Sequence, residues 1–135
     1  MKVLLDTNVI FSAFATRGLA QAVFELCLER HTIIVSEHVL SELAARLEKK
    51  LRMPSEKAQL VTDYLRESCL LGEENSVEER MCRDEKDKHI LGLAKKMRAD
   101  FIVTGDMDLL VLKRYCDTPI VTPRGFWEKE KKRKR

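Results

Sequence analysis

The sequence predicts an α/β protein with a parallel sheet and helices on both of its faces. Short apolar runs alternate along the chain with longer stretches in which apolar residues recur at helical spacing. The first run, residues 3–5, is continuously apolar, as is typical of a strand buried on both faces. Strands that alternate with helices favour a parallel sheet. Two of the runs end in a carboxylate, Asp6 and Asp106, and ligands of open α/β sheets bind outside the carboxyl ends of the strands.

The first half of the chain is predicted to supply two strands and three helices. Residues 3–5 form a central strand, and Asn8 can cap a short helix that ends before Gly18. Apolar residues then recur at helical spacing through residues 19–30, and residues 32–35 form the second strand. Ser36 is a suitable cap for a third helix that extends to about residue 50.

The second half repeats this alternation after a boundary at Pro54. Three further strands are expected, the first of them a short edge strand: residues 69–71, 101–104 and 120–122. Three further helices are expected: one with an apolar stripe between residues 58 and 65, one at residues 87–98 capped by Asp84, and a short one through residues 108–112. Residues 72–79 are acidic and predicted to form a loop, and Pro123 closes the last strand.

Positive charge is concentrated at the C-terminal end. The formal net charge is +3, and residues 129–135 hold six bases and one acid, so residues 1–128 carry −2. We therefore predict a domain at residues 1–128, which is not broadly basic, and a disordered basic tail at residues 129–135. The tail has two interpretations, a solvated terminus or a contact for RNA phosphates. In the second interpretation the contacting residues would be Lys131, Lys132 and Arg133.

Length and composition exclude several other classes. The 135 residues, 44% of them hydrophobic, suffice for one domain with a core and are too few for two. The four cysteines form no CxxC motif, so we expect reduced thiols in a cytoplasmic protein. Asp6 interrupts the first apolar run, so no signal peptide is expected. No stretch approaches the roughly 18 apolar residues of a membrane span, so no membrane association is expected.

Four carboxylates are candidates for a common site: Asp6, Glu42, Asp87 and Asp106. Two of them end strands, Asp87 starts a predicted helix, and Glu42 precedes an apolar residue of the third helix. Such a cluster is unfavourable unless protons or a cation neutralise it. An all-oxygen ligand set suits Mg²⁺ or Mn²⁺ rather than Zn²⁺, and a hard divalent ion among carboxylates suits phosphodiester chemistry. Each acid taken alone could equally be a helix cap or a solvated group.

Four segments in order resemble the motifs of PIN-domain proteins. Val-Leu-Leu-Asp-Thr-Asn-Val at residues 3–9 resembles their first motif, and Val-Ser-Glu-His-Val-Leu-Ser-Glu-Leu at residues 35–43 resembles their second. Cys-Arg-Asp-Glu-Lys-Asp at residues 82–87 is similar to their third, and residues 100–110 are similar to their fourth. Thr-Pro-Arg-Gly-Phe at residues 122–126 resembles their usual ending. The resemblance therefore covers nearly the whole chain.

This resemblance implies a three-layer α/β/α sandwich with a central parallel sheet and the activity of a Mg²⁺- or Mn²⁺-dependent endoribonuclease. Many short members are toxins of bacterial or archaeal toxin–antitoxin pairs of the VapC type. The resemblance therefore also implies an RNA substrate, a cognate antitoxin and a homodimer. Matching positions give four catalytic acids: Asp6, Glu42, Asp87 and Asp106.

The resemblance also distributes roles among these residues. Asp6, Asp87 and Asp106 would hold the metal, and Glu42 would bind a second ion or orient the attacking water. Three further residues would support them: Asn8, Thr104 and Asp108. The chain departs from the family at Glu85 and Lys86, where close members often have proline and an acid. Lys86 is therefore a candidate contact for a neighbouring acid or an RNA phosphate.

Two alternatives remain at this point. The chain could be a non-catalytic PIN-like module that binds RNA or a protein, although four convergent carboxylates are of no use to an RNA-binding surface. A phospho-aspartate phosphatase is disfavoured because that family carries a second acid where this chain has Asn8. The histidines are expected at the surface, although His38 and Glu42 are four apart and share a helix face.

Overall fold

The computed structural model describes residues 1–73 and 85–133, and the side chains of residues 85–87 fall outside that description. Its strands are β1 (Lys2–Leu5), β2 (Thr32–Val35), β3 (Leu70–Leu71), β4 (Phe101–Val103), β5 (Arg114–Tyr115) and β6 (Thr118–Val121). Its helices are α1 (Thr7–Ala15), α2 (Leu19–Arg30), α3 (Glu37–Leu51), α4 (Ser55–Ser68), α5 (Glu85–Met97), α6 (Met107–Leu110) and α7 (Pro123–Arg133).

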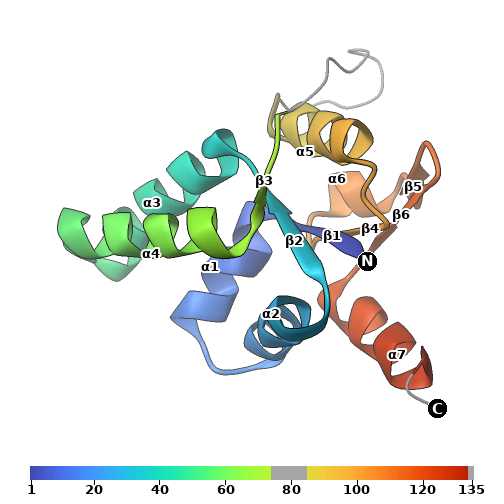
Figure 1. Ribbon diagram of the computed structural model, residues 1–135, viewed down its shortest axis with the longest axis horizontal. Helices are drawn as coiled ribbons and strands as arrows, with labels where there is room; N and C mark the ends of the chain where they lie inside the picture. Colours follow the sequence, from blue (N-terminus) through green and yellow to red (C-terminus); the bar gives the residue numbers. More distant parts are fainter. Residues whose placement is uncertain (74–84, 134–135) are drawn as a thin grey trace.

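The described strands form one sheet in the order β3-β2-β1-β4-β6-β5 (Figure 1). All neighbouring pairs are parallel except β5 with β6. Strand β1 lies between β2 and β4, with Leu4 opposite Ile34 on one side and Ile102 on the other. The predicted parallel sheet is confirmed, and the two strands that precede Asp6 and Asp106 are neighbours in it.

Helices cover both faces of the sheet. Figure 1 shows α5 and α6 on one side of the strands and α2 and α7 on the other, with the α3/α4 hairpin projecting beyond β2 and β3. The fold is thus the three-layer α/β/α sandwich predicted above. In such a sandwich the strands end at two opposite edges, and the carboxyl ends of the parallel strands share one of them.

Strand β1 lies inside the sheet because its side chains are apolar on both faces and are most stable when buried. Val3, Leu4 and Leu5 are all fully buried, and so is Ile34 on the neighbouring strand. Each such side chain contributes about 1.5–3 kcal/mol of apolar burial. Asp6 is the first polar residue after this run, so packing of the strand fixes where the carboxylate emerges.

The antiparallel β5–β6 hairpin differs from the prediction. A single strand was expected at residues 120–122, but β6 begins at Thr118, and the preceding β5 pairs with it in the opposite direction. Lys113 and Cys116 both adopt left-handed backbone angles, with φ of 61° and 54°. Neither residue is glycine, so the sequence carried no clear signal for these turns.

The C-terminal segment is also different from the prediction. Residues 129–133 were expected to be disordered but belong to α7, which begins at Pro123. Thr122 caps this helix, because its hydroxyl accepts a hydrogen bond from Gly125 N at 2.9 Å. Phe126 is fully buried, and one turn later Glu130 is only 6% exposed. The last turn of α7 is therefore packed, and the prediction of a disordered tail is wrong for residues 129–133.

Within the described residues no single helix is long and apolar enough to cross a membrane, although α1 and α2 would meet the criterion together across a bend of 107°. The described cysteines, Cys27, Cys69 and Cys116, form no disulfide. Burial raises the pKa of Cys27 to about 12 and that of Cys69 to about 11, so these two thiols stay protonated.

Candidate functional site

Asp6 is positioned by two neighbouring strands and the helix that follows it. Its backbone N–H donates to Val103 O at 3.0 Å, and this bond continues the β1–β4 ladder past the end of β1. Its carbonyl oxygen accepts from Val9 N and Ile10 N, at 2.9 and 3.1 Å, so Asp6 is the N-cap residue of α1. The residue is 9% exposed. Its carboxylate is thus held at the carboxyl edge of the sheet, largely out of water.

The hydroxyl of Thr104 joins the ends of β1 and β4. Thr104 Oγ1 donates to Asp6 Oδ2 at 2.8 Å and accepts from Asp106 N at 3.0 Å, and the residue is fully buried. Asp106 in turn caps α6, because its Oδ1 accepts from Asp108 N at 2.9 Å. These hydrogen bonds give Thr104, predicted as a supporting residue, a contact with both Asp6 and Asp106. Asp108 supports Asp106 through its backbone, since its own side chain is exposed.

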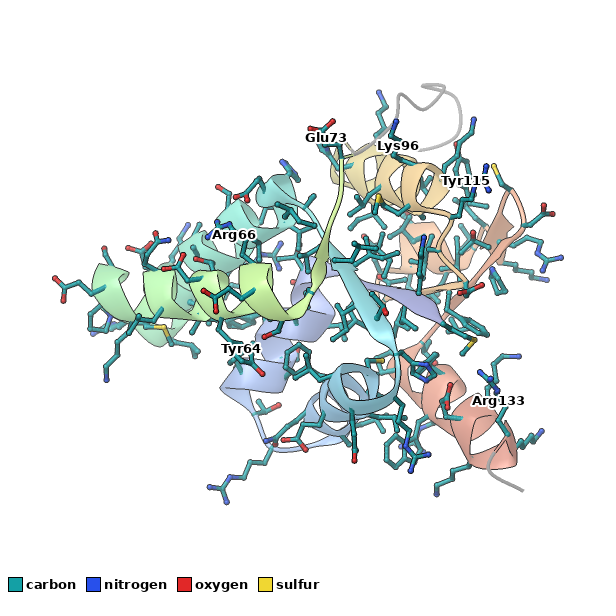
Figure 2. All side chains as sticks on the ribbon, viewed as in Figure 1. Tyr64, Arg66, Glu73, Lys96, Tyr115 and Arg133 are labelled. Atoms are coloured by element: carbon teal, nitrogen blue, oxygen red, sulfur yellow. The ribbon has the colours of Figure 1, made fainter. Side chains whose placement is uncertain are left out.

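Glu42 reaches the site from the first turns of α3. Ser36, buried at the carboxyl end of β2, caps this helix by accepting from Val39 N at 3.1 Å. The side chain of Glu42 is 21% exposed and lies 3.2 Å from His38 Nε2, one helical turn earlier. On another side of the same turn, Arg66 of α4 donates two hydrogen bonds to Glu37, at 2.8 and 2.9 Å. Figure 2 shows Arg66 on α4 beside α3.

The charges of these acids act on one another. Burial raises the pKa of Asp6 above its ordinary value, and the negative charges of Asp106 and Glu42 raise it further. Hydrogen bonds from the Thr104 hydroxyl and the Thr7 backbone lower the same pKa in part. Within the described residues no basic side chain forms an ion pair with Asp6 or Asp106. The structure therefore brings three of the four predicted acids into electrostatic contact without a protein cation to balance Asp6 and Asp106.

The remaining predicted residues are placed less completely. Asp87 and Lys86 lie in the first turn of α5, but their side chains are outside the described part of the chain. Asn8 is exposed in the first turn of α1. The three basic residues predicted to contact RNA, Lys131, Lys132 and Arg133, are exposed in the last turn of α7.

The donor chemistry at this edge fits a hard divalent cation. Carboxylate oxygens are the ligands that Mg²⁺ and Mn²⁺ prefer, and a cation would relieve the repulsion that raises the pKa of Asp6. Within residues 1–73 and 88–133, whose side chains are described, no group of three His, Cys, Asp or Glu side chains lies at metal-ligand spacing. Asp6 and Asp106 would thus need the fourth predicted acid, Asp87, or solvent to complete a coordination shell.

Two large hollows in the surface lie away from these acids. One, of about 370 Å³, lies between α3 and α4, and another, of about 410 Å³, lies between the end of α5 and the β5–β6 turn. Neither is lined by Asp6, Glu42 or Asp106. The convergence of charge, rather than the depth of a cavity, therefore marks the candidate site.

Sequence reasoning missed two polar features beside the acids. The imidazoles of His38 and His89 stack on each other with ring centroids 3.7 Å apart, although the histidines were expected to be surface residues. The four-residue spacing of His38 and Glu42 indicated that these two side chains share a helix face, but no sequence signal indicated that His38 stacks on His89. The hydroxyl of Thr7, next to Asp6, is buried without a hydrogen-bond partner in the described part of the chain. No sequence signal distinguished Thr7.

The model of the PIN-domain family matches residues 2–108. The chain belongs to the PIN-domain family. Searching the curated proteins gives no significant match. Among solved structures, a similar chain occurs in VapBC2 from Rickettsia felis, which was crystallised with a DNA fragment from the VapBC2 promoter. The TM-score is 0.61 at 18% sequence identity, and the match covers 90% of this chain and 98% of that chain. FitAcB from Neisseria gonorrhoeae has a TM-score of 0.55 at 19% identity, with 90% and 97% covered. These likenesses show the fold of the PIN domain over nearly the whole chain.

Proposed function

We propose that this PIN domain is a Mg²⁺- or Mn²⁺-dependent endoribonuclease that hydrolyses phosphodiester bonds of RNA in the cytoplasm. One observation carries the proposal: the negative charges of Asp106 and Glu42 act on the buried carboxylate of Asp6 at the carboxyl edge of the sheet, and no protein cation pairs with Asp6 or Asp106 in the described part of the chain. Membership in a family whose members are generally nucleases supports it.

A bound Mg²⁺ or Mn²⁺ would lower the pKa of water and neutralise the charge that develops on the phosphate. Asp6, Asp87 and Asp106 are the residues proposed to hold it. Thr104 fixes the orientation of the Asp6 carboxylate, and the Asp108 N–H fixes that of Asp106. Glu42 is proposed to orient the attacking water.

The proposed reaction is an in-line displacement at phosphorus. A bond forms between the water oxygen and phosphorus while the bond from phosphorus to the 3′-oxygen breaks. The proton released by the water passes to bulk solvent through the carboxylates, and the departing 3′-oxygen gains a proton. The products are a 5′-phosphate and a 3′-hydroxyl.

Contacts to RNA outside the acids remain part of the proposal. Lys86 precedes Asp87 by one residue, so it is suitably placed in the sequence to meet a phosphate. The basic turn of α7 lies elsewhere, because Arg133 Nη1 is 3.0 Å from Met1 Sδ, at the amino edge of the sheet. Any RNA contact through Lys131, Lys132 or Arg133 would therefore lie at the opposite edge from Asp6.

We further propose that the chain is the toxin of a toxin–antitoxin pair and forms a homodimer. The motif resemblance implies both properties. The structural likeness to chains of VapBC2 and FitAcB over 90% of the present chain supports the first. Co-expression with the product of a small neighbouring gene, followed by co-purification, would test the antitoxin. Sedimentation of the isolated chain would test the dimer.

The decisive experiment is RNA cleavage by wild type, Asp6→Asn and Asp100→Asn. Asp100 is a matched control because it flanks β4 at the amino edge, where its Oδ2 accepts from Lys2 N at 2.8 Å. Wild type and Asp100→Asn should cleave with Mg²⁺ or Mn²⁺ and stop with EDTA. Cleavage by Asp6→Asn should fall by more than the roughly 10–100-fold that is lost when only a hydrogen-bonding partner of a metal ligand is removed. Undiminished cleavage after chelation would contradict the proposal, and RNA binding without cleavage would favour the non-catalytic module.

A further inference from the structure

The stacked pair of His38 and His89 connects the two helices that carry predicted catalytic acids. His38 is the second residue of α3, one turn before Glu42, and His89 follows Asp87 by two residues on α5. The two rings lie face to face, with an interplanar angle of 22° and a centroid distance of 3.7 Å. Close stacking of this kind fixes both the separation and the orientation of two rings.

The same imidazole of His38 also contacts Glu42. His38 Nε2 lies 3.2 Å from Glu42 Oε1; this nitrogen is shielded from solvent, although the whole side chain is 35% exposed, and within the described residues it makes no hydrogen bond. The face of the ring is therefore stacked on His89, and its edge lies beside the carboxylate of Glu42. A carboxylate at an unsupported helix surface would instead sample several rotamers.

Other contacts hold the backbone at the start of α3, which carries this ring. Ser36 caps the helix from the end of β2, and the paired hydrogen bonds of Arg66 hold Glu37 on another side of the same turn. His38 lies between these two anchored residues and Glu42. The backbone that carries His38 is thus held by the sheet and by α4, and its ring stacks on α5.

We propose that the His38–His89 stack is a bridge between α3 and α5 that positions the Glu42 carboxylate toward Asp6. His38 is a positioning residue, because it acts through Glu42, whose charge reaches Asp6. This inference rests on the proposed function for its effect on cleavage. Its effects on ring geometry and on Mn²⁺ affinity are independent of any RNA substrate.

Four variants separate the parts of the bridge. His38→Phe keeps a ring to stack on His89 but removes the nitrogen that faces Glu42. His38→Gln keeps a nitrogen donor at similar reach and removes the ring. His89→Ala removes the stacking partner of His38. Gln59→Ala is the matched control, since Gln59 Nε2 donates to Asp63 Oδ1, four residues on, at 2.8 Å on the exposed surface of α4.

Three measurements are made on each full-length variant. NMR spectra of the metal-free protein at fixed pH should show contacts between the ring protons of His38 and His89 and a Glu42 carboxyl shift that moves in His38→Phe and returns in His38→Gln. Mn²⁺ affinity, from calorimetric titration, should weaken roughly tenfold in His38→Phe. The kcat of RNA cleavage by His38→Phe should fall roughly 10–100-fold with KM unchanged. His38→Gln should recover most of the loss in Mn²⁺ affinity and most of the loss in kcat. His89→Ala should give part of each loss, and Gln59→Ala none.

The outcomes distinguish the bridge from the nuclease. If His38→Phe binds Mn²⁺ as tightly as wild type and cleaves RNA at the wild-type rate, the bridge is overturned while the proposed function stands. Equal losses in His38→Phe and His38→Gln, with lower melting temperatures, also overturn it, because His38 would then only stabilise the helix. If Mn²⁺ affinity follows the expected order but the wild type cleaves no RNA, the bridge stands and the proposed function fails.

Discussion

At the amino edge of the sheet, the buried carboxylate of Glu130 lies 2.8 Å from His31 Nε2. At the carboxyl edge, the buried carboxylate of Asp6 is subject to the negative charges of Asp106 and Glu42. Both side chains are nearly removed from water, since Glu130 is 6% and Asp6 9% exposed. Glu130 has basic neighbours, because Arg133 also lies 3.5 Å from it. Within the described residues the Asp6 carboxylate accepts hydrogen bonds from the Thr104 hydroxyl and the Thr7 backbone and forms no ion pair.

The rest of the amino edge is held by direct hydrogen bonds and ring contacts. Asp100 accepts from the backbone of Lys2, and the Thr118 hydroxyl donates to Ala99 O at 2.9 Å. The ring of Phe126 packs edge-on against His31 and Phe101, with centroid distances of 5.9 and 5.5 Å. The contacts of the amino edge thus hold the fold together, while the carboxyl edge carries mutually repelling acids, for which we propose a ligand. The comparison implies that mutations at the first edge change stability and mutations at the second change activity.

The largest expected effect is on stability at the amino edge. Glu130→Ala should destabilise the protein by about 1–3 kcal/mol, because it leaves the buried imidazole of His31 without the carboxylate that lies 2.8 Å from it. The exposed Glu128→Ala on the same helix should stay within about 0.5 kcal/mol of wild type. Urea denaturation measures both. A loss below about 1 kcal/mol in Glu130→Ala would mean that α7 is not anchored by this contact.

A smaller effect is expected from one threonine hydroxyl at each edge. Thr104→Val removes the hydrogen bond to Asp6 and should reduce cleavage roughly 10–100-fold, equivalent to about 1.4–2.7 kcal/mol. Thr118→Val removes a hydrogen bond of nearly equal length at the amino edge and should cost about 1 kcal/mol of stability with cleavage unchanged. Steady-state kinetics and denaturation of both variants test the contrast. Equal losses of activity would remove the distinction between the edges.

The smallest expected effect is a pH dependence at Asp6. The folded-state pKa of Asp6 is raised above its unfolded value of about 3.9, so its carboxylate costs stability at neutral pH. That cost disappears as the pH falls below the unfolded value. Metal-free Asp6→Asn should therefore exceed wild type by about 1–2 kcal/mol at pH 7, and the two should converge near pH 4. Denaturation of both proteins across this range would reveal a constant difference if the cause were not titration.

The sequence predicted the carboxyl edge well because its signals are local. Asp6 and Asp106 each end an apolar run, and the alternation of strands and helices predicted that both runs are strands of one parallel sheet, although it did not establish that they are neighbours. The amino edge was predicted poorly because its contacts are distant in sequence. Glu130 and His31 are separated by 99 positions, and nothing near Glu130 indicated a buried partner.

Two further failures have different physical origins, one local and one long-range. Pro123 was interpreted only as the end of a strand, although proline is also favoured in the first turn of a helix, where α7 begins. The His38–His89 stack joins two helices whose relative placement depends on the whole sheet, so periodicity within either helix does not predict it. The role of Asp87 stays a prediction.

The central claim is that Asp6 and Asp106, which form no ion pair within the described residues, are kept for a divalent cation. The most direct test is thermal melting of wild type and Asp6→Asn at neutral pH, with EDTA and with millimolar Mn²⁺. In EDTA, Asp6→Asn should melt a few °C higher than wild type, because one repelling charge is removed. Mn²⁺ at about 100 times its Kd should stabilise the wild type by about 2.7 kcal/mol and the variant much less. If Asp6→Asn melts lower in EDTA and gains as much from Mn²⁺ as wild type, Asp6 is a structural helix cap and the claim is contradicted.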